Sequence, residues 1–333
     1  MALIHKKDNN VLLAAGDQLI SYDLESQADE LLRLPEPNLP EKLTKSQLDV
    51  LKKEVRKISS IDSHSEKGYT VVATENKQVV VYDKQFQVLK NFIVNRAAGK
   101  VCFTPSSDIL VADRTGDVYL YKLNEIEAPQ LLLGHLSVIL DMTLSECGKY
   151  IITFSFCLGH SEFVTSIKLV KNILVSASGD GTVRFWNYLK GEQLDIIYTN
   201  KYIMDNSLLE VFTRDMDKEK VDVTALPVTD MQVYYDAKKL YVAVSVHNYN
   251  ALQIHTTDLL SCDLYILSDK FSVFKLIDEE FIETNVPCLE KLYDKYKHIL
   301  KLNESSAITV LYKRKFDNVQ EYLVRKRQRL ETK

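Results

Sequence analysis

The sequence predicts an all-β fold, a β-propeller in which short antiparallel sheets, the blades, surround a central axis. Apolar strands alternate with turns rich in Gly, Asn and Asp along most of the 333 residues. The pair Gly-His occurs at 134–135 and again at 159–160. The single tryptophan, Trp186, ends a strand 27 positions after Gly159, a spacing that fits within a repeat of about 40–45 residues.

The segment that ends at Trp186 has the features of a WD40-type blade. In such a blade a His, a strand Ser or Thr, a turn Asp and the Trp indole hydrogen-bond to one another and fix the strand register. His160, Asp180 and Trp186 take three places. Ser176 and Ser178 share a strand face, so the sequence alone does not distinguish them, and Ser176 is entered as the fourth residue. A Ser, a His and an Asp are also the components of a hydrolytic triad. Because the Gly-His and Asp-Gly contexts belong to a blade, we interpret the four residues as a structural tetrad.

The other strands are predicted from period-two alternation and turn signals. Before the tetrad blade they are expected at Val11–Ala15, Gln18–Asp23, Tyr69–Thr74, Val79–Asp83, Lys100–Thr104, Asp108–Asp113, Val118–Tyr121, Ile139–Ser145 and Tyr150–Thr153. After it they are expected at Gln193–Tyr198, Val221–Ala225, Gln232–Tyr235, Lys239–Val246, His255–Leu260, Asp263–Leu267 and Ser272–Ile277. One of the last three is a candidate to pair with the N-terminal strands and close the ring.

One blade is too short. Gly134 and Gly159 are 25 positions apart, whereas a full repeat needs about 40–45 residues. The segment Thr153–Phe156 runs directly into the next Gly-His pair without a second turn or a third strand. We therefore expect about seven blades, of which the fourth is truncated by roughly a hairpin. The neighbouring blades then either close up or leave a strand edge exposed.

Two regions depart from the blade pattern, so the propeller is assigned to residues 1–312 and a basic helical tail to residues 313–333. Residues 35–57 are interpreted as a charged insertion between blades, in which Thr44–Lys57 forms a short helix. In the tail, Asp317 and Gln320 form a capping-box-like helix start. The tail is either a solvated helix or a surface for RNA phosphates or an acidic partner, through Lys313, Arg314, Lys315, Arg325, Lys326 and Arg327.

Composition excludes several classes of protein. The formal net charge is -4, so a surface coated throughout with nucleic acid is not indicated. The five cysteines include no CxxC pair and no His at metal-ligand spacing, which favours reduced thiols. No apolar run reaches about 18 residues and the first 21 residues lack a signal-peptide core, so neither a membrane span nor a secretory signal is expected. No phosphate loop or nucleophile motif occurs, and we predict that the chain is not an enzyme.

Several segments closely resemble, in the same order, the non-catalytic WD-repeat subunit of tRNA (guanine-N7) methyltransferase, the Wuho family. Detailed resemblance covers about residues 97–192 and 308–330. It is carried by Leu110–Tyr119, Leu133–Asp141, Phe156–Val164, Ser178–Thr182 and Tyr312–Val319.

The resemblance implies a subunit without chemistry of its own. In the family, the propeller binds and stabilises the catalytic methyltransferase as a heterodimer, and the pair methylates N7 of a guanine in tRNA. S-adenosylmethionine would be bound by the catalytic partner, so no cofactor is expected in this chain, and tRNA is reached through the complex. Asp113, Arg114 and Asp117 match a docking turn, and Arg114 is the best candidate for a salt bridge to the partner.

The chain departs from the family after Tyr150–Thr153, where relatives carry a further charged turn and strand that contribute to docking. None of those residues has a counterpart here.

The alternative interpretation is a general WD-repeat scaffold that binds peptides and has no role in tRNA modification. From the resemblance we expect a nuclear protein, with the cytoplasm as a second location. The basic clusters of the tail are compatible with nuclear import, although a solvated helix end explains them as well.

Overall fold

The computed structural model describes most of the chain up to Thr284 and shorter pieces beyond it. The described residues are 3–7, 10–38, 56–64, 66–135, 138–145, 147–154, 159–203, 205–235, 240–249, 252–256, 263–267, 271–277, 280–284, 287–296, 298 and 311–312. The helix expected within Thr44–Lys57 lies almost entirely, and the basic tail wholly, outside these residues.

The described strands form seven antiparallel sheets, each built from strands consecutive in the sequence. The first three sheets have four strands each. Sheet A contains β1 (Leu3–Lys7), β2 (Asn10–Ala15), β3 (Gln18–Asp23) and β4 (Asp29–Arg33). Sheet B contains β5 (Ile58–Ser63), β6 (Thr70–Thr74), β7 (Gln78–Tyr82) and β8 (Val88–Ile93). Sheet C contains β9 (Ala98–Phe103), β10 (Ile109–Asp113), β11 (Asp117–Lys122) and β12 (Glu125–Gly134).

The remaining sheets differ in size. Sheet D contains only β13 (Asp141–Leu144) and β14 (Ile151–Phe154). Sheet E is complete, with β15 (Val164–Val170), β16 (Ile173–Ser178), β17 (Thr182–Asn187) and β18 (Glu192–Tyr198). Sheet F contains β19 (Val228–Tyr235), β20 (Leu240–Val246) and β21 (Leu252–Thr256), and sheet G contains β22 (Asp263–Leu267), β23 (Phe271–Ile277) and β24 (Glu280–Thr284).

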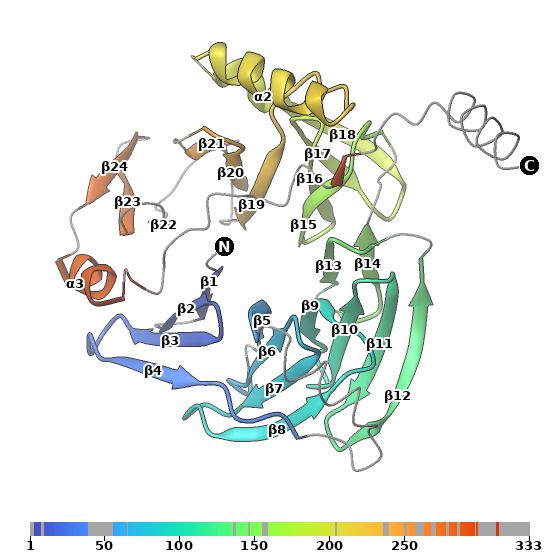
Figure 1. Ribbon diagram of the computed structural model, residues 1–333, viewed down its shortest axis with the longest axis vertical. Coiled ribbons are helices and arrows are strands. Elements are labelled where there is room, and N and C mark those ends of the chain that lie inside the picture. The colour runs from blue at the N-terminus through green and yellow to red at the C-terminus, as the bar shows by residue number, and fades with distance from the viewer. Residues whose placement is uncertain are drawn as a thin grey trace, which may run out of the picture.

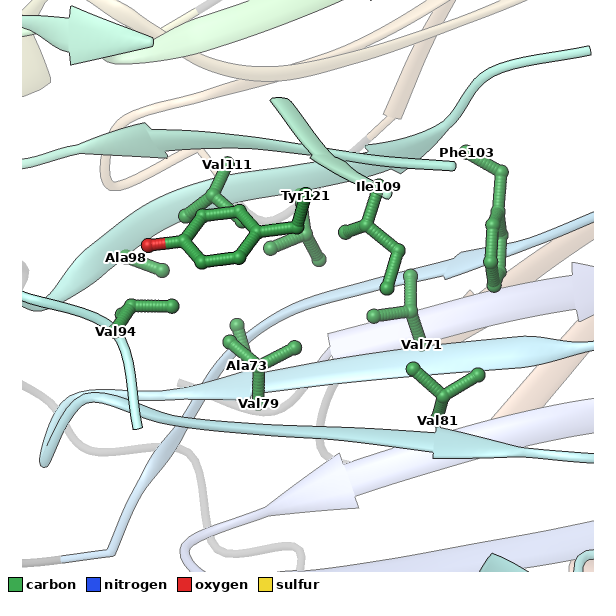
Figure 2. Close-up of a cluster of buried hydrophobic side chains, with 11 residues drawn as sticks. Val71, Ala73, Val79, Val81, Val94, Ala98, Phe103, Ile109, Val111 and Tyr121 are labelled. Carbon is green, nitrogen blue, oxygen red and sulfur yellow. The ribbon is translucent and has the colours of Figure 1, made fainter. Parts of the chain in front are cut away.

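The sheets follow one another around a central axis, as expected for a WD40-type β-propeller (Figure 1). The first strands of neighbouring sheets lie side by side, in the order β1, β5, β9, β13, β15 and β19. Apolar side chains fill the space between facing sheets. Figure 2 shows this between sheets B and C, where Val71, Val79 and Val81 face Ile109 and Val111. Packing against its neighbours therefore adds to the stability that each sheet gains from its own strand pairs.

The truncation predicted from the sequence is present in sheet D, which has two strands among the described residues. The seven sheets agree with the expected number of about seven blades, but among the described residues only four hold four strands, whereas sheets F and G hold three each. The expected ring closure is wrong for the described residues. Sheet A is completed by the N-terminal strands β1–β4, and β22 and β23 pair within sheet G instead.

Sequence reasoning missed α2 (Ser207–Lys218) and assigned a strand to Val221–Ala225, where the structure has none. Val221 is buried against Phe212 and Met216 of the helix, so its apolar side chain covers α2 rather than a sheet. The α2 helix lies beside sheets E and F (Figure 1). A second missed helix, α3 (Pro287–Tyr296), follows sheet G.

Several strands were also missed, among them β1, β4, β8, β12 and β24. Helix α3 reaches sheet A, because Lys295 Nζ and Tyr296 Oη each lie 2.6 Å from Oδ2 of Asp29. Among the described residues, no helix has the length and apolarity needed to cross a membrane.

Candidate functional site

The four tetrad residues meet inside sheet E. Nδ1 of His160 lies 2.9 Å from Oδ2 of Asp180, and Nε2 lies 2.8 Å from the hydroxyl of Ser176. The Trp186 indole N–H donates to the same hydroxyl at 2.9 Å. The structure therefore places Ser176 in the fourth position, whereas Ser178 donates to the Phe163 carbonyl at 2.9 Å.

The direction of the hydrogen bonds follows from the donors available. Since an indole N–H only donates, Ser176 accepts from Trp186 and is free to donate its proton to Nε2 of His160. Nδ1–H of His160 then donates to the Asp180 carboxylate. Burial alone would raise the pKa of Asp180, but hydrogen bonds from His160, Thr182 and the Ser161 N–H outweigh it and lower the pKa to about 2.

This geometry describes a structural relay rather than a hydrolytic triad. Ser176 is fully buried, and its hydroxyl is held between His160 and Trp186. A nucleophile must reach a substrate carbonyl, and this oxygen does not reach the surface. A partial version of the relay occurs in sheet D, where Nε2 of His135 lies 2.7 Å from Oγ1 of Thr153.

Sheet D is held to both neighbouring sheets by the carboxylate of Asp141. Lys100 of sheet C places its Nζ 2.8 Å from Oδ1, and the Ile167 N–H of sheet E donates to Oδ2 at 2.9 Å. The Asp141 side chain is 5% exposed and that of Lys100 is 29% exposed. Burial opposes ionisation of Asp141, but Lys100 and Lys168 outweigh it and lower its pKa. One carboxylate thus joins the first strands of three consecutive sheets.

The β-turns between the second and third strands of sheets A, B, C and E form one face of the ring, which we call the turn face. Its turns are residues 15–18, 74–78, 113–117 and 178–182. The turn of sheet E is covered, because Tyr312 Oη donates to the Gly179 carbonyl at 2.9 Å and the Tyr312 ring packs on Phe163. Phe212 of α2 belongs to the same apolar cluster.

Charged side chains gather on the turn face over sheets B and C. Arg114 Nη2 lies 2.8 Å from Glu75 Oε1, and Lys57 Nζ lies 3.9 Å from the same oxygen. We call Lys57, Glu75 and Arg114 the charge cluster. The Arg114 side chain is 50% exposed and that of Glu75 is 33% exposed, so the cluster is open to solvent. Two cations share one carboxylate, which leaves a net charge of about +1.

The three residues expected to contact a partner have different environments. Arg114 is exposed, as a docking contact requires. Asp117 is partly buried, and its N–H donates to Asp113. Asp113 is 2% exposed, and its Oδ1 accepts hydrogen bonds from the Thr115 N–H, the Thr115 hydroxyl and the Asp117 N–H. This burial does not fit the contact expected for Asp113, because its carboxylate closes the turn.

Sequence reasoning missed Glu75 and Lys57, which come from a different sheet and from the segment before it. No local signal connects them to Arg114, since Glu75 and Arg114 are 39 positions apart. The basic residues Lys313, Arg314, Lys315, Arg325, Lys326 and Arg327 lie outside the described residues. In the part of the chain that the structure describes, no group of three or more His, Cys, Asp or Glu side chains is arranged to hold a metal ion.

Comparison with known proteins gives a consistent family. Residues 148–265 match the model of the tRNA methyltransferase TRM82 WD40 domain. A Drosophila yakuba protein named tRNA (guanine-N(7)-)-methyltransferase non-catalytic subunit wuho is 31% identical over 71% of this chain and 64% of its own length. The protein of that name from Drosophila pseudoobscura pseudoobscura is 30% identical over 77% of this chain and 73% of its own length.

The chain belongs to the family of these non-catalytic subunits. A Danio rerio member, the non-catalytic subunit wdr4, is 28% identical over 79% of this chain and 75% of its own length. The match to the Drosophila yakuba member spans just under two thirds of that relative.

Solved structures agree on the architecture of this family member. A chain of the crystal structure of the mitotic checkpoint complex superposes with a TM-score of 0.55 at 12% identity and covers 85% of this chain and 78% of its own. The C-terminal WD40 domain of Sif2 gives a TM-score of 0.51 at 14% identity, with coverage of 73% and 63%. At these identities the likeness concerns the fold alone, and it confirms the predicted WD40-type β-propeller.

Proposed function

We propose that the chain is the non-catalytic subunit that binds and stabilises the catalytic tRNA (guanine-N7) methyltransferase, so that the heterodimer forms N7-methylguanosine in tRNA. Family membership supports this role, because the relatives are named as non-catalytic subunits of that methyltransferase. The observation that identifies a docking surface is the exposed charge cluster on the turn face. It lies on adjacent sheets of a rigid ring, which suits docking of a second protein.

The docking contact falls on sheets B and C rather than on sheet E. The turn of sheet E is covered by Tyr312 and the cluster that contains α2. Over sheets B and C, Arg114 remains half exposed. Because Glu75 already pairs with Arg114 and Lys57, the excess positive charge favours an acidic patch on the catalytic subunit. Such a contact weakens as salt concentration rises.

The proposed role also determines which subunit binds the methyl donor and which contacts tRNA. The catalytic partner binds S-adenosylmethionine and performs methyl transfer, and this chain contributes no cofactor site. tRNA reaches the heterodimer mainly through the partner, with the basic residues at 313–315 and 325–327 as a second contact for phosphates. The complex works in the nucleus. Separate measurements test the last two points: tRNA crosslinking to the tail, and localisation of the tagged chain.

Co-expression with the catalytic methyltransferase subunit of the same organism tests the proposal. We expect a one-to-one complex in size-exclusion chromatography and more N7-methylguanine in tRNA than the catalytic subunit produces alone. Arg114→Glu is expected to weaken the complex at least about tenfold, because it places a negative charge against an acidic patch. Arg33→Glu, which makes the same charge reversal at an exposed arginine on β4, is the matched control and leaves binding unchanged.

The same experiment distinguishes the methyltransferase subunit from the alternative function, a general WD-repeat scaffold. A folded chain that forms no complex, and instead recovers a mixture of other proteins, would favour a general WD-repeat scaffold. If the complex survives Arg114→Glu and depends on another face of the chain, the methyltransferase partner is correct but the proposed docking surface is refuted.

A further inference from the structure

The outer edge of β14, which we call the β14 edge (Ile151–Phe154), lacks a neighbouring strand among the described residues. Strand β14 pairs with β13 on one side only. In the complete sheets the corresponding second strand pairs on both sides, as β10 does with β9 and β11. An antiparallel strand directs about half of its backbone N–H and C=O groups to each side. The β14 edge therefore presents a row of backbone donors and acceptors to which no described strand pairs.

The side chains next to the β14 edge are apolar on both faces of sheet D. Ile151 packs in the cluster shared with sheet C, together with Met142 and Leu132. Ile152 packs in the cluster shared with sheet E, together with Trp186 and Tyr188. An added strand would therefore continue both clusters, with every side chain placed between two sheets. Such a strand has to be apolar on both of its faces, like the buried strands of the complete sheets.

The β14 edge also lacks the features that protect an exposed strand. Its four residues, Ile-Ile-Thr-Phe, include no charge, no Pro and no Gly. Natural edge strands are usually kept from pairing by lysines, prolines or bulges. The neighbouring Tyr150 is 49% exposed and packs edge-on against Tyr188, with ring centroids 6.1 Å apart. This stretch favours pairing with an uncharged strand.

A second copy of the propeller is the wrong shape for the β14 edge. Sheets C and E each continue for two strands beyond the position of β14 and so extend about 10 Å further outward. Another copy would have its own β14 recessed in the same way. Pairing the two edges would force sheets C and E of both copies into the same space. A narrow extended segment meets no such obstruction.

We propose that the β14 edge is a strand-acceptor site that takes an extended, uncharged, apolar segment of about four residues from a partner protein. Recognition is by β-augmentation: main-chain hydrogen bonds supply affinity, and alternate apolar side chains enter the clusters shared with sheets C and E. This site is separate from the charge cluster. It does not depend on the identity of the methyltransferase partner.

A peptide with the sequence of β7, Gln78–Tyr82, is the probe, carrying lysines beyond both ends for solubility. Strand β7 holds the third position in sheet B, the position that no described strand takes in sheet D, and it is buried along its whole length. We expect the labelled peptide to bind the full chain. It should also slow hydrogen exchange about tenfold at the outward amides of Ile151–Phe154. The same peptide with Val80→Pro should bind about tenfold more weakly, because it loses a donor and fits a strand poorly.

A variant of the chain provides the second control. A copy of Glu75–Ile93, which contains the turn at 75–77 and the β7–β8 hairpin, inserted after Phe154 should occupy the β14 edge in cis and abolish peptide binding. A Gly-Ser insert of equal length should leave binding intact. Three results would each overturn the proposal: no binding of the β7 peptide, protection at another edge such as β8, or a concentration-dependent dimer that protects Ile151–Phe154 without peptide. If the hairpin variant fails to fold, binding of the β7 peptide compared with its Val80→Pro form still tests the proposal.

Discussion

Replacing Ser176 by alanine should destabilise sheet E substantially, because one hydroxyl serves two partners. It lies 2.8 Å from Nε2 of His160 and 2.9 Å from the Trp186 indole nitrogen. Removing it leaves both groups without that partner. A buried polar group that loses its hydrogen bond costs about 1–3 kcal/mol. Trp186 is only partly buried, so its share lies near the lower limit, and we expect a total loss of about 2–4 kcal/mol.

The assay is urea unfolding followed by intrinsic fluorescence. Trp186 is the only tryptophan in the chain, so its emission reports directly on sheet E. A loss of this size is a large fraction of the 5–15 kcal/mol typical of a folded domain and should lower the melting temperature by roughly 5–10 °C. Ser161→Ala is the control, since Ser161 is exposed and is bound to Asp180 through its backbone N–H. If Ser176→Ala and Ser161→Ala unfold at the same urea concentration, the relay is not stabilising and the reasoning fails.

Three further predictions follow from other contacts. The folded-state pKa of Asp180 is about 2, below its ordinary value, so its contribution of about 2 kcal/mol is present above pH 4. That contribution should be lost as pH falls from about 4 to 2; an Asp180→Asn variant with an unchanged acid-unfolding curve would contradict this. Lys100→Met should cost about 2 kcal/mol because it leaves the buried charge of Asp141 without its nearest cation, and Asp141→Asn should relieve part of that cost in a double-mutant cycle. Additive losses in the cycle would show that the pair is not coupled. Tyr312→Phe should lower the free energy of unfolding by about 1 kcal/mol, because it removes the hydrogen bond to the Gly179 carbonyl. Thermal unfolding measures this loss, and an unchanged melting temperature would show that the hydrogen bond does not stabilise the fold.

The charge cluster shows why part of the candidate site was not predictable. Arg114 was identified from its turn, which is a local feature of the sequence. Glu75 lies in the turn of the preceding sheet, and only the packing of sheet B against sheet C brings it to 2.8 Å from Arg114. For Asp113 the turn was located correctly, but its exposure was not, because Oδ1 turns inward to bind the N–H groups that follow it.

The sequence by itself determined the features that depend on spacing and local pattern. Period-two alternation located most strands, and the Gly-His, Asp-Gly and Trp markers predicted the relay of sheet E. The short distance between Gly134 and Gly159 was sufficient to predict the two-stranded sheet D, because a missing hairpin removes residues from the chain itself.

Only the tertiary structure decided how those parts meet. It selected Ser176 over Ser178, since the two serines share a strand face and only the position of His160 distinguishes them. It also showed that Asp141 joins sheet D to its neighbours, and that Val221 covers a helix instead of forming a strand. These outcomes depend on contacts between residues far apart in the chain, and such contacts leave no periodic trace in the sequence.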